Sequence, residues 1–446
     1  MIGLRGGMKA GPSRRAFLKS STTAMVTWMV APGQGFVPAV AAPSQGTSSK
    51  VIEKSRPLII EVSAGEYDRQ NSPVSFQLPE SWRDQRDFIL ERVDTGELVD
   101  TQIDVSPSPR LVWLIQDVLK ASQTRRYRLA PGVSAALPTP AETCDDGRSL
   151  MVKVAGRSVL RYNMAVVPAP DPQLSLDQRS GYIYPLFNPI GQAVTDDFPP
   201  DHTDNLPPDH AYQHSVWFAW SKATFEGRPV NFWELSERKG TIEHVELEKS
   251  GGGAVFAHFT ALLRHVDLAA PGGPKVALHE TWRLLIYNLT DAFVFDLEST
   301  QACATQSPLQ VLENSWGGMA IRGHRNWFDT KNSEYLTSEG KTRKDGNQTR
   351  PRWVDMYGWV DGKLSGIALL SHPENFRFPQ PARLHPEKPY FCFATPALGP
   401  FSIEPGKPYR SRYRFYVHQG RPDPAAIDRV WTEFAYPMQG HVVQEG

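Results

Sequence analysis

The sequence predicts an all-β protein, with a small N-terminal β-sandwich followed by a large antiparallel β-sandwich. Short runs of β-branched and aromatic residues recur along the chain, and clusters of Asp, Gly, Pro and Ser separate them at the spacing of strands and turns. Helix caps and a 3.6-residue hydrophobic period are almost absent. Hydrophobic residues make up 40% of the 446 residues and aromatic residues 11%, which is enough for a large core.

The first 42 residues predict a twin-arginine-type signal peptide. Residues 13–19 (SRRAFLK) carry paired arginines, a modest apolar stretch follows at 24–30, and residues 39–41 read AVA. The apolar stretch is too short and polar to span a bilayer comfortably. We therefore expect export by the twin-arginine machinery to the periplasm or the medium, no stable membrane span, and a linker at 43–55.

Charge and cysteine content exclude several classes of protein. The chain has 48 basic and 48 acidic residues, and residues 1–42 hold five of the bases and no acid, so the remainder carries −5. This balance lacks the positive charge of a nucleic-acid-binding protein. The three cysteines are widely separated without a C-x-x-C motif, so we expect at most one disulfide and no zinc–cysteine site.

The elements follow in order along the chain. Residues 56–170 are expected to form the N-terminal β-sandwich and a short β connection, and a polar break follows at 171–179. Residues 171–436 form the large sandwich, and 437–446 a tail. The predicted strands lie at 58–62, 74–78, 88–93, 111–115, 254–263, 276–287, 292–298, 364–370 and 410–417. Residues 94–97 (DTGE) predict a hairpin turn, 251–253 (GGG) a hairpin tip and 427–434 a short closing helix. Residues 111–119 could also form a helix, but the run is too short to outweigh the strand pattern.

Histidine is confined to the second part of the chain. All 12 histidines lie between His202 and His441. Imidazole is the side chain best suited to proton transfer and metal binding near neutral pH, so this asymmetry indicates a site in the large sandwich and a scaffold role for the N-terminal part. The alternative is that histidine simply follows loop composition.

The densest polar stretch is a proline-rich loop at 196–214 that leads into an aromatic strand. Asp209, His210 and His214 could form a metal site, because carboxylate and imidazole are usual ligands of zinc and manganese. Without a spacing signature such as H-E-x-x-H, we favour a polar substrate pocket that uses the same loop, and we assign no metal ligand.

Arginine and tryptophan supply the candidate binding groups. Arginine forks grip carboxylate, sulfate or phosphate, and tryptophan faces stack on sugar rings. The stretch 372–386 is rich in proline, aromatic and basic residues, and could be either part of the site or a structural clamp. The predicted substrate-binding residues are Arg322, Arg325, Arg377, Arg383, Trp217, Trp233 and Trp316, and the predicted catalytic residues are His210, Tyr212, His214, Glu339 and His385. Nucleophile-elbow, P-loop and dinucleotide motifs are absent from the sequence.

Several motifs together resemble one family. The stretches GYIYPLFNPIGQAVTDDFPPDH (181–202), DHAYQHSVWFAWSKATFEGRPVNFWEL (209–235) and SHPENFRFPQPARLHPEKPYFCF (371–393) are similar to the uncharacterised bacterial family catalogued under the label PmoA. The family pattern runs D-H-x-H-Q-H-G. This chain keeps Asp209, His210, Gln213 and His214, but it has Tyr212 in place of the middle histidine, and tyrosine is a poorer ligand for most divalent metals.

The resemblance implies an exported protein, often encoded beside sugar-processing genes, with a supersandwich like that of sugar mutarotases and polysaccharide lyases. It also suggests a metal-dependent oxygenase, but a methane oxygenase subunit spans the membrane and this chain has no such segment after its signal. Fold analogy alone does not give function.

We therefore expect a carbohydrate-active protein, a glycoside hydrolase or a polysaccharide lyase that acts on a polar or acidic glycan. A hydrolase needs two carboxylates, for which Asp209, Glu226 and Glu339 are candidates. A lyase needs a base and an acid, for which histidine and Tyr212 serve, with arginine neutralising the uronate. The alternative is a non-catalytic glycan-binding or envelope scaffold protein. Convergence of the candidates in one pocket would favour an enzyme, and scatter would favour a scaffold.

Overall fold

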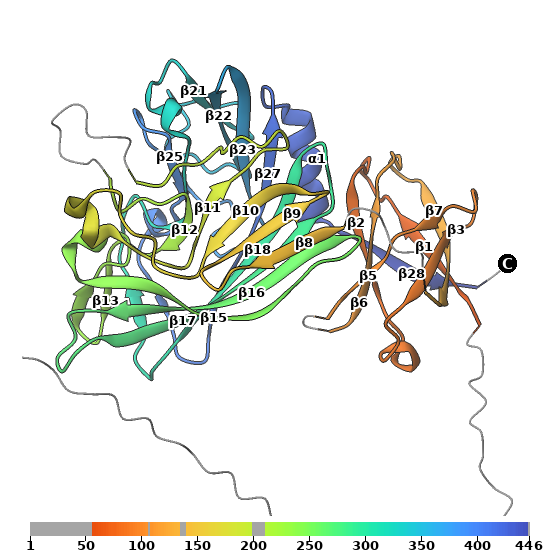
Figure 1. The fold of residues 1–446 in the computed structure, drawn as a ribbon, viewed down its shortest axis with the longest axis horizontal. Coiled ribbons are helices and arrows are strands. Elements are labelled where there is room, and N and C mark those ends of the chain that lie inside the picture. Colours follow the sequence, from red (N-terminus) through yellow and green to blue (C-terminus); the bar gives the residue numbers. More distant parts are fainter. Residues whose placement is uncertain (1–55, 106–107, 134–139, 199–209, 445–446) are drawn as a thin grey trace, which may run out of the picture. The chain divides into compact units, whose positions relative to one another are not determined.

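The computed structural model describes residues 56–105, 108–133, 140–198 and 210–444 (Figure 1). The predicted signal peptide (1–42) and linker (43–55) lie outside these residues. The described chain is nearly all β, and the predicted all-β class is confirmed. No helix within the described ranges is both long enough and apolar enough to cross a membrane.

The N-terminal strands form a β-sandwich in the order β4-β3-β7-β1-β28-β2-β6-β5. Their bounds are β1 Leu58–Ser63, β2 Ser72–Gln77, β3 Phe88–Arg92, β4 Leu98–Val99, β5 Gln102–Asp104, β6 Arg110–Ile115, β7 Thr124–Pro131 and β28 Met438–Val443. Exposed and buried residues alternate along β7, as expected for a strand with one face on the core. Trp113 and Tyr127 pack edge to face in that core, with ring centroids 5.4 Å apart.

The predicted hairpin turn at 94–97 is present. The backbone N–H of Gly96 donates to the Arg92 carbonyl oxygen over 2.8 Å, and Gly96 has φ +73°, a conformation that glycine adopts without strain.

Two segments differ from the expected division of the chain. β28 falls in the expected tail, where it pairs antiparallel with β1 and parallel with β2 and so closes two edges that would otherwise be unpaired. β8 (Ala141–Asp145), β9 (Ser149–Val154) and β10 (Arg157–Asn163) fall in the expected connection, yet they extend a sheet of the large sandwich.

The large sandwich consists of two eight-stranded sheets and a small four-stranded sheet. The first has the order β24-β25-β20-β12-β11-β10-β9-β8, the second β15-β16-β17-β18-β27-β23-β22-β21, and the third β14-β13-β19-β26. The remaining bounds are β11 Tyr182–Leu186, β12 Val216–Ala219, β13 Ala223–Phe225, β14 Arg228–Val230, β15 Gly240–Gly251, β16 Phe256–Asp267, β17 Lys275–Tyr287, β18 Phe293–Cys303, β19 Leu309–Val311, β20 Gly318–Arg322, β21 Ser333–Thr337, β22 Trp353–Val360, β23 Lys363–Ser371, β24 Ala382–Leu384, β25 Tyr390–Phe393, β26 Phe401–Ile403 and β27 Tyr409–Gln419. The sandwich holds the largest core cluster, which includes Trp217, Trp282 and the stacked rings of Phe295 and Phe415.

The predicted closing helix is α1 (Pro424–Ala435). The Asp423 side chain caps its N-terminus by accepting the backbone N–H groups of Ala425 and Ala426, and Pro424 occupies the first turn. Ile427, Trp431 and Phe434 pack against Trp353 and Leu370 of the second sheet. The helix thereby leads the chain from β27 to β28.

Candidate functional site

Neighbouring strands of the first sheet bring several predicted site residues into one cavity of about 220 Å³, which we call the aromatic cavity. The loop before β12 supplies His210, Tyr212 and Gln213, and the segments after β14 and before β20 supply Trp233 and Trp316. The β24–β25 hairpin supplies Arg383, His385, Tyr390, Phe391 and Cys392. Because β12, β20, β25 and β24 are adjacent in the sheet, segments far apart in sequence meet here.

Two imidazoles meet at this cavity. The rings of His210 and His385 are nearly perpendicular, with centroids 5.4 Å apart, and Tyr212 and Tyr390 lie 5.6 and 5.4 Å from His210. His385 Nδ1 accepts the backbone N–H of Glu387 (3.2 Å) and of Lys388 (3.0 Å). The neutral ring therefore carries its proton on Nε2, and His385 is a hydrogen-bond donor from that atom.

The loop that carries His210 is held by a buried arginine. Arg322 of β20 donates from Nη1 to the carbonyl oxygens of His210 and Gln213 (both 3.1 Å), and from Nη2 to that of Phe198 (2.9 Å). His210 has φ +59°, an unfavourable conformation for a side chain of this size. Arg322, predicted to bind substrate, instead positions the loop: it is fully buried and does not line the cavity.

His214, predicted as catalytic, lies in the core rather than in the aromatic cavity. Its Nδ1 is 2.5 Å from Asp197 Oδ1, and its Nε2 is 3.0 Å from the Asp177 carbonyl oxygen. Complete burial lowers the pKa of His214, and the contact with Asp197 opposes this shift. Both ring nitrogens of His214 are therefore engaged inside the protein, away from the cavity.

Arg325, Arg377 and Trp217 also lie outside the cavity. Arg377 donates to the carbonyl oxygens of Thr395, Gly399 and Pro400 and so ties its part of the stretch 372–386 to a neighbouring loop. Arg383 and His385 of the same stretch line the cavity. Arg325 pairs with Asp196 over 2.8 Å. Trp217 is buried beneath Trp233, with ring centroids 4.2 Å apart.

The candidate carboxylates do not reach the cavity. Glu339 follows β21 on an exposed turn, where it accepts the Ser338 hydroxyl over 2.7 Å. Glu226 lies in the β13–β14 hairpin and pairs with Arg228 and Lys275. Asp209 and His202 lie outside the described residues. The described residues that line the cavity therefore include no carboxylate.

A family model describes most of this sandwich. The family of unknown function DUF6807 matches residues 149–432, from the start of β9 into α1. The chain belongs to this family. The DUF6807 region contains all the residues that line the aromatic cavity, and it leaves out β1 to β8 and β28.

Comparisons outside the family are distant. No curated protein matches the chain. Among solved structures, a protein of glycosyl hydrolase family 38 from Enterococcus faecalis is 11% identical with a TM-score of 0.40, over 88% of this chain and 48% of that one. An α-mannosidase from Enterococcus faecalis V583 is 10% identical with a TM-score of 0.44, over 88% and 46%. The DUF6807 chain thus spans about half the length of each.

Metal-binding groups do not gather in the described part of the DUF6807 chain. No cluster of three or more His, Cys, Asp or Glu side chains suited to a metal ion occurs there. His210 and His214, which might have shared a metal, lie in different surroundings. The three cysteines are free. Burial raises the pKa of Cys392, at the cavity wall, to about 12, so this thiol stays protonated at neutral pH.

Tyr390 and Cys392 of the cavity were not predicted as site residues. The run YFCF (390–393) reads only as a buried strand. The available signal was the closeness of Tyr390 to His385 in sequence. A short hairpin at Pro386–Pro389 brings the chain back beside the histidine, and the backbone N–H of His385 donates to the Tyr390 carbonyl oxygen over 2.9 Å. Pairing His385 with the strand that follows it would have identified Tyr390.

Proposed function

We propose that this DUF6807 protein is an exported carbohydrate-active enzyme that cleaves a uronate-containing glycan by β-elimination. The observation that carries the proposal is the composition of the aromatic cavity. Two histidines, two tyrosines, one arginine and two tryptophans line it, without a carboxylate among the described lining residues. These groups can bind a sugar and transfer protons.

The binding part of the proposal rests on Trp316 and Arg383. Trp316 is 43% exposed at the cavity, where its face is open to a sugar ring. Arg383 Nη1 donates to Asn347 and to the Leu384 carbonyl oxygen, while its Nε and Nη2 have no hydrogen bond to the described residues. These N–H groups suit a carboxylate. Typical ligand sites measure roughly 300–1,000 Å³, so a cavity of about 220 Å³ fits one sugar unit of a polymer.

The chemical step requires one base and one acid. His210 removes the proton from the carbon next to the uronate carboxylate, and Arg383 neutralises the charge that develops on that carboxylate. The electron pair then forms a C=C bond as the bond to the leaving oxygen breaks, and the Tyr212 hydroxyl donates its proton to that oxygen. His385 Nε2–H orients the substrate by a hydrogen bond. The products are an unsaturated uronate and a free hydroxyl, so no water is consumed.

Hydrolysis has less support from the same geometry. A glycoside hydrolase of the usual kind places two carboxyl groups across the scissile bond, roughly 5–10 Å apart. Glu226 and Glu339 lie elsewhere in the fold, and both interact with neighbouring side chains. Elimination needs no such pair. A purely glycan-binding role would use Trp316 in the same way, and the experiment below separates the two.

Export and the likeness to the PmoA-labelled family also belong to the proposal. The twin-arginine pattern at 13–19 supports export, and the motifs at 181–202, 209–235 and 371–393 support the family likeness.

The test is a screen of the mature protein, isolated from the periplasm, against charged and neutral polysaccharides with and without EDTA. We expect absorbance from unsaturated uronate together with new reducing ends, unaffected by EDTA. Tyr212→Phe should lower the rate about 100-fold or more, since it removes the proton donor. Tyr436→Phe, at an exposed tyrosine, is the matched control.

Three results would contradict the proposal. Reducing ends without absorbance would indicate a hydrolase. Loss of activity with EDTA would indicate a metal site. Binding of a glycan without either product would indicate a scaffold.

A further inference from the structure

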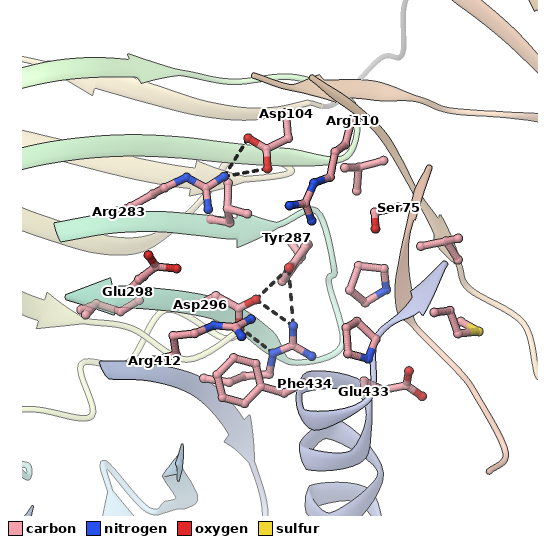
Figure 2. Close-up of a pocket in the computed structure, with 18 of the residues that line it drawn as sticks. Ser75, Asp104, Arg110, Arg283, Tyr287, Asp296, Glu298, Arg412, Glu433 and Phe434 are labelled. Carbon is pink, nitrogen blue, oxygen red and sulfur yellow. Dashed lines mark hydrogen bonds and ion pairs between the residues drawn. The ribbon is translucent and has the colours of Figure 1, made fainter. Parts of the chain in front are cut away.

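A second and larger cavity lies between the N-terminal sandwich and the outer face of β17, β18 and β27 (Figure 2). This charged cleft measures about 530 Å³, within the range of roughly 300–1,000 Å³ typical of ligand sites, and clefts between domains are frequent sites of this kind. Strands β2, β5, β6 and β28 form the wall on the side of the N-terminal sandwich, and helix α1 supplies a further wall. It shares no residue with the aromatic cavity.

Most charges in the cleft are paired. Arg283 Nη2 contacts both carboxylate oxygens of Asp104 at 2.7 Å, which joins the two walls. Arg414 binds Asp296 through Nε (2.6 Å) and Nη2 (2.8 Å), and the Tyr287 hydroxyl donates to the same carboxylate (2.8 Å). Figure 2 shows these contacts as dashed lines. Bidentate contacts of this kind fix the orientation of the paired side chains, which present polar atoms to the cleft.

Two further pairs fix the remaining acids of the helix side. Arg412 contacts Glu374 over 3.2 Å. Glu433 of α1 contacts the buried Arg69 over 3.0 Å. Each of these carboxylates thus already has an arginine partner.

Arg110 is different, because its guanidinium makes no ion pair or side-chain hydrogen bond with the described residues. It is half-buried on β6, and in Figure 2 it projects from the N-terminal wall into the cleft near Tyr287. Glu298 of β18 likewise has no ion pair, but it lies in register between Arg283 of β17 and Arg412 of β27. Two guanidinium groups therefore flank Glu298. Arg110 lies opposite Asp104 in the β5–β6 ladder, but Arg283 binds both oxygens of that carboxylate. Arg110 and the exposed Arg410 are thus the lining arginines without an ion pair to a described residue, and Arg110 is the less exposed of the two.

An uncompensated arginine in a partly enclosed cleft is suited to an anion. A guanidinium fork binds a carboxylate through two parallel hydrogen bonds. Around Arg110, the exposed Gln439, Glu298 and the ion-paired side chains supply donors and acceptors for hydroxyl groups. The rings of Phe434 and Tyr287 are buried beneath the guanidinium groups of Arg412 and Arg414, so the lining is mainly polar. Such a mixture matches a sugar that carries a carboxylate better than an apolar ligand.

We propose that the charged cleft binds an acidic oligosaccharide, with one uronate carboxylate seated on Arg110. The cleft is a binding site separate from the aromatic cavity, and it holds the chain of an acidic glycan whether or not the cavity performs elimination. Glu298 opposes this ligand by like-charge repulsion.

The test is calorimetric titration of the full mature chain with trigalacturonate, performed on protein that carries Trp316→Ala so that binding in the aromatic cavity is weakened. Arg110→Ala should weaken binding roughly tenfold or more, since it removes a charge-assisted bidentate contact. Glu298→Gln should tighten binding a few-fold, because it removes a repelling charge. Arg56→Ala, which removes an exposed arginine and changes the net charge equally, should leave binding unchanged. The affinity should fall as salt is raised.

The ligand comparison identifies the source of the carboxylate. Trigalacturonate should bind more tightly than monomeric galacturonate, and neutral maltotriose should bind much more weakly than either. Equal binding of the monomer and the trimer would indicate a small free carboxylate as the ligand and would overturn the oligosaccharide assignment. Wild-type affinity in Arg110→Ala, or weaker binding in Glu298→Gln, would overturn the site. Loss of elimination with intact binding to the cleft would affect only the proposed function.

Discussion

Individual histidines in this protein have distinct roles that their residue type does not reveal. Histidine is confined to the second part of the chain, and His210 and His385 line the aromatic cavity there. His214, only four residues from His210, is buried against Asp197. Sequence spacing cannot separate the two, because the loop that carries both is held by hydrogen bonds from Arg322, which lies more than a hundred residues away.

His372 makes stability depend on pH. Burial, together with the nearby Arg412, lowers the pKa of His372 to about 4, whereas the unfolded chain protonates this ring near pH 6.5. As pH falls from 6.5 towards 4, the unfolded state therefore binds a proton that the folded state does not, and stability is lost. We expect a loss of roughly 3 kcal/mol from this residue over that window.

The measurement is urea unfolding at several pH values between 4.5 and 7. His372→Asn should flatten the dependence of the free energy of unfolding on pH, while His279→Asn, at an exposed histidine of β17, should retain it. An unchanged slope in His372→Asn would show that other groups cause the acid sensitivity.

At the scale of elements, the long strands were predictable and the loop geometry was not. The predicted strands at 276–287 and 364–370 agree within two residues with β17 and β23. Buried and less buried residues alternate along much of β17, and β23 is a short, continuously buried run, and both patterns are typical of strands. The loop before β12 offered only polar and aromatic residue types. Its shape comes from the Arg322 guanidinium, and a strand arginine at a buried position is indistinguishable in sequence from one that faces a ligand.

Arg322→Met should destabilise the protein by about 3 kcal/mol, because three carbonyl oxygens lose the charged donor that satisfies them. The free energy of unfolding measures this change. Arg264→Met, which removes an exposed arginine paired with Glu243, should cost less than about 1 kcal/mol. Equal losses in the two variants would show that the loop does not depend on Arg322.

For the whole molecule, the all-β class followed from residue pattern, whereas the pairing of the chain ends did not. β28 is short and half-exposed, and nothing in residues 437–446 signals that its partners lie at the other end of the chain. Packing fixes its place: Gly440 lies so close to Ile60 and Trp113 that a Cβ atom there would come within 2.6 Å of the Ile60 side chain. The register of β28 against β1 and β2 is therefore set by tertiary packing and not by its own residues.

Deletion of residues 437–446 should therefore expose the N-terminal sandwich to proteolysis. We expect rapid tryptic cleavage within 58–131 and a resistant large sandwich, since β1 and β2 both lose a partner. Deletion of 444–446 alone, beyond β28, should leave the pattern unchanged. Equal resistance of both deletions would show that β28 contributes little to the sandwich.

The position of β28 at the end of the chain also delays completion of the N-terminal sandwich during synthesis. About 380 residues separate Leu58 from Met438, and at ~5–20 residues per second the ribosome needs ~20–80 s to make them. During that interval β1 and β2 have been synthesised with facing edges that no strand yet occupies, and such edges attract other chains. The N-terminal sandwich is thus the first part to leave the ribosome and the last to be completed. Chaperones that bind exposed strand edges are needed there for the longest time.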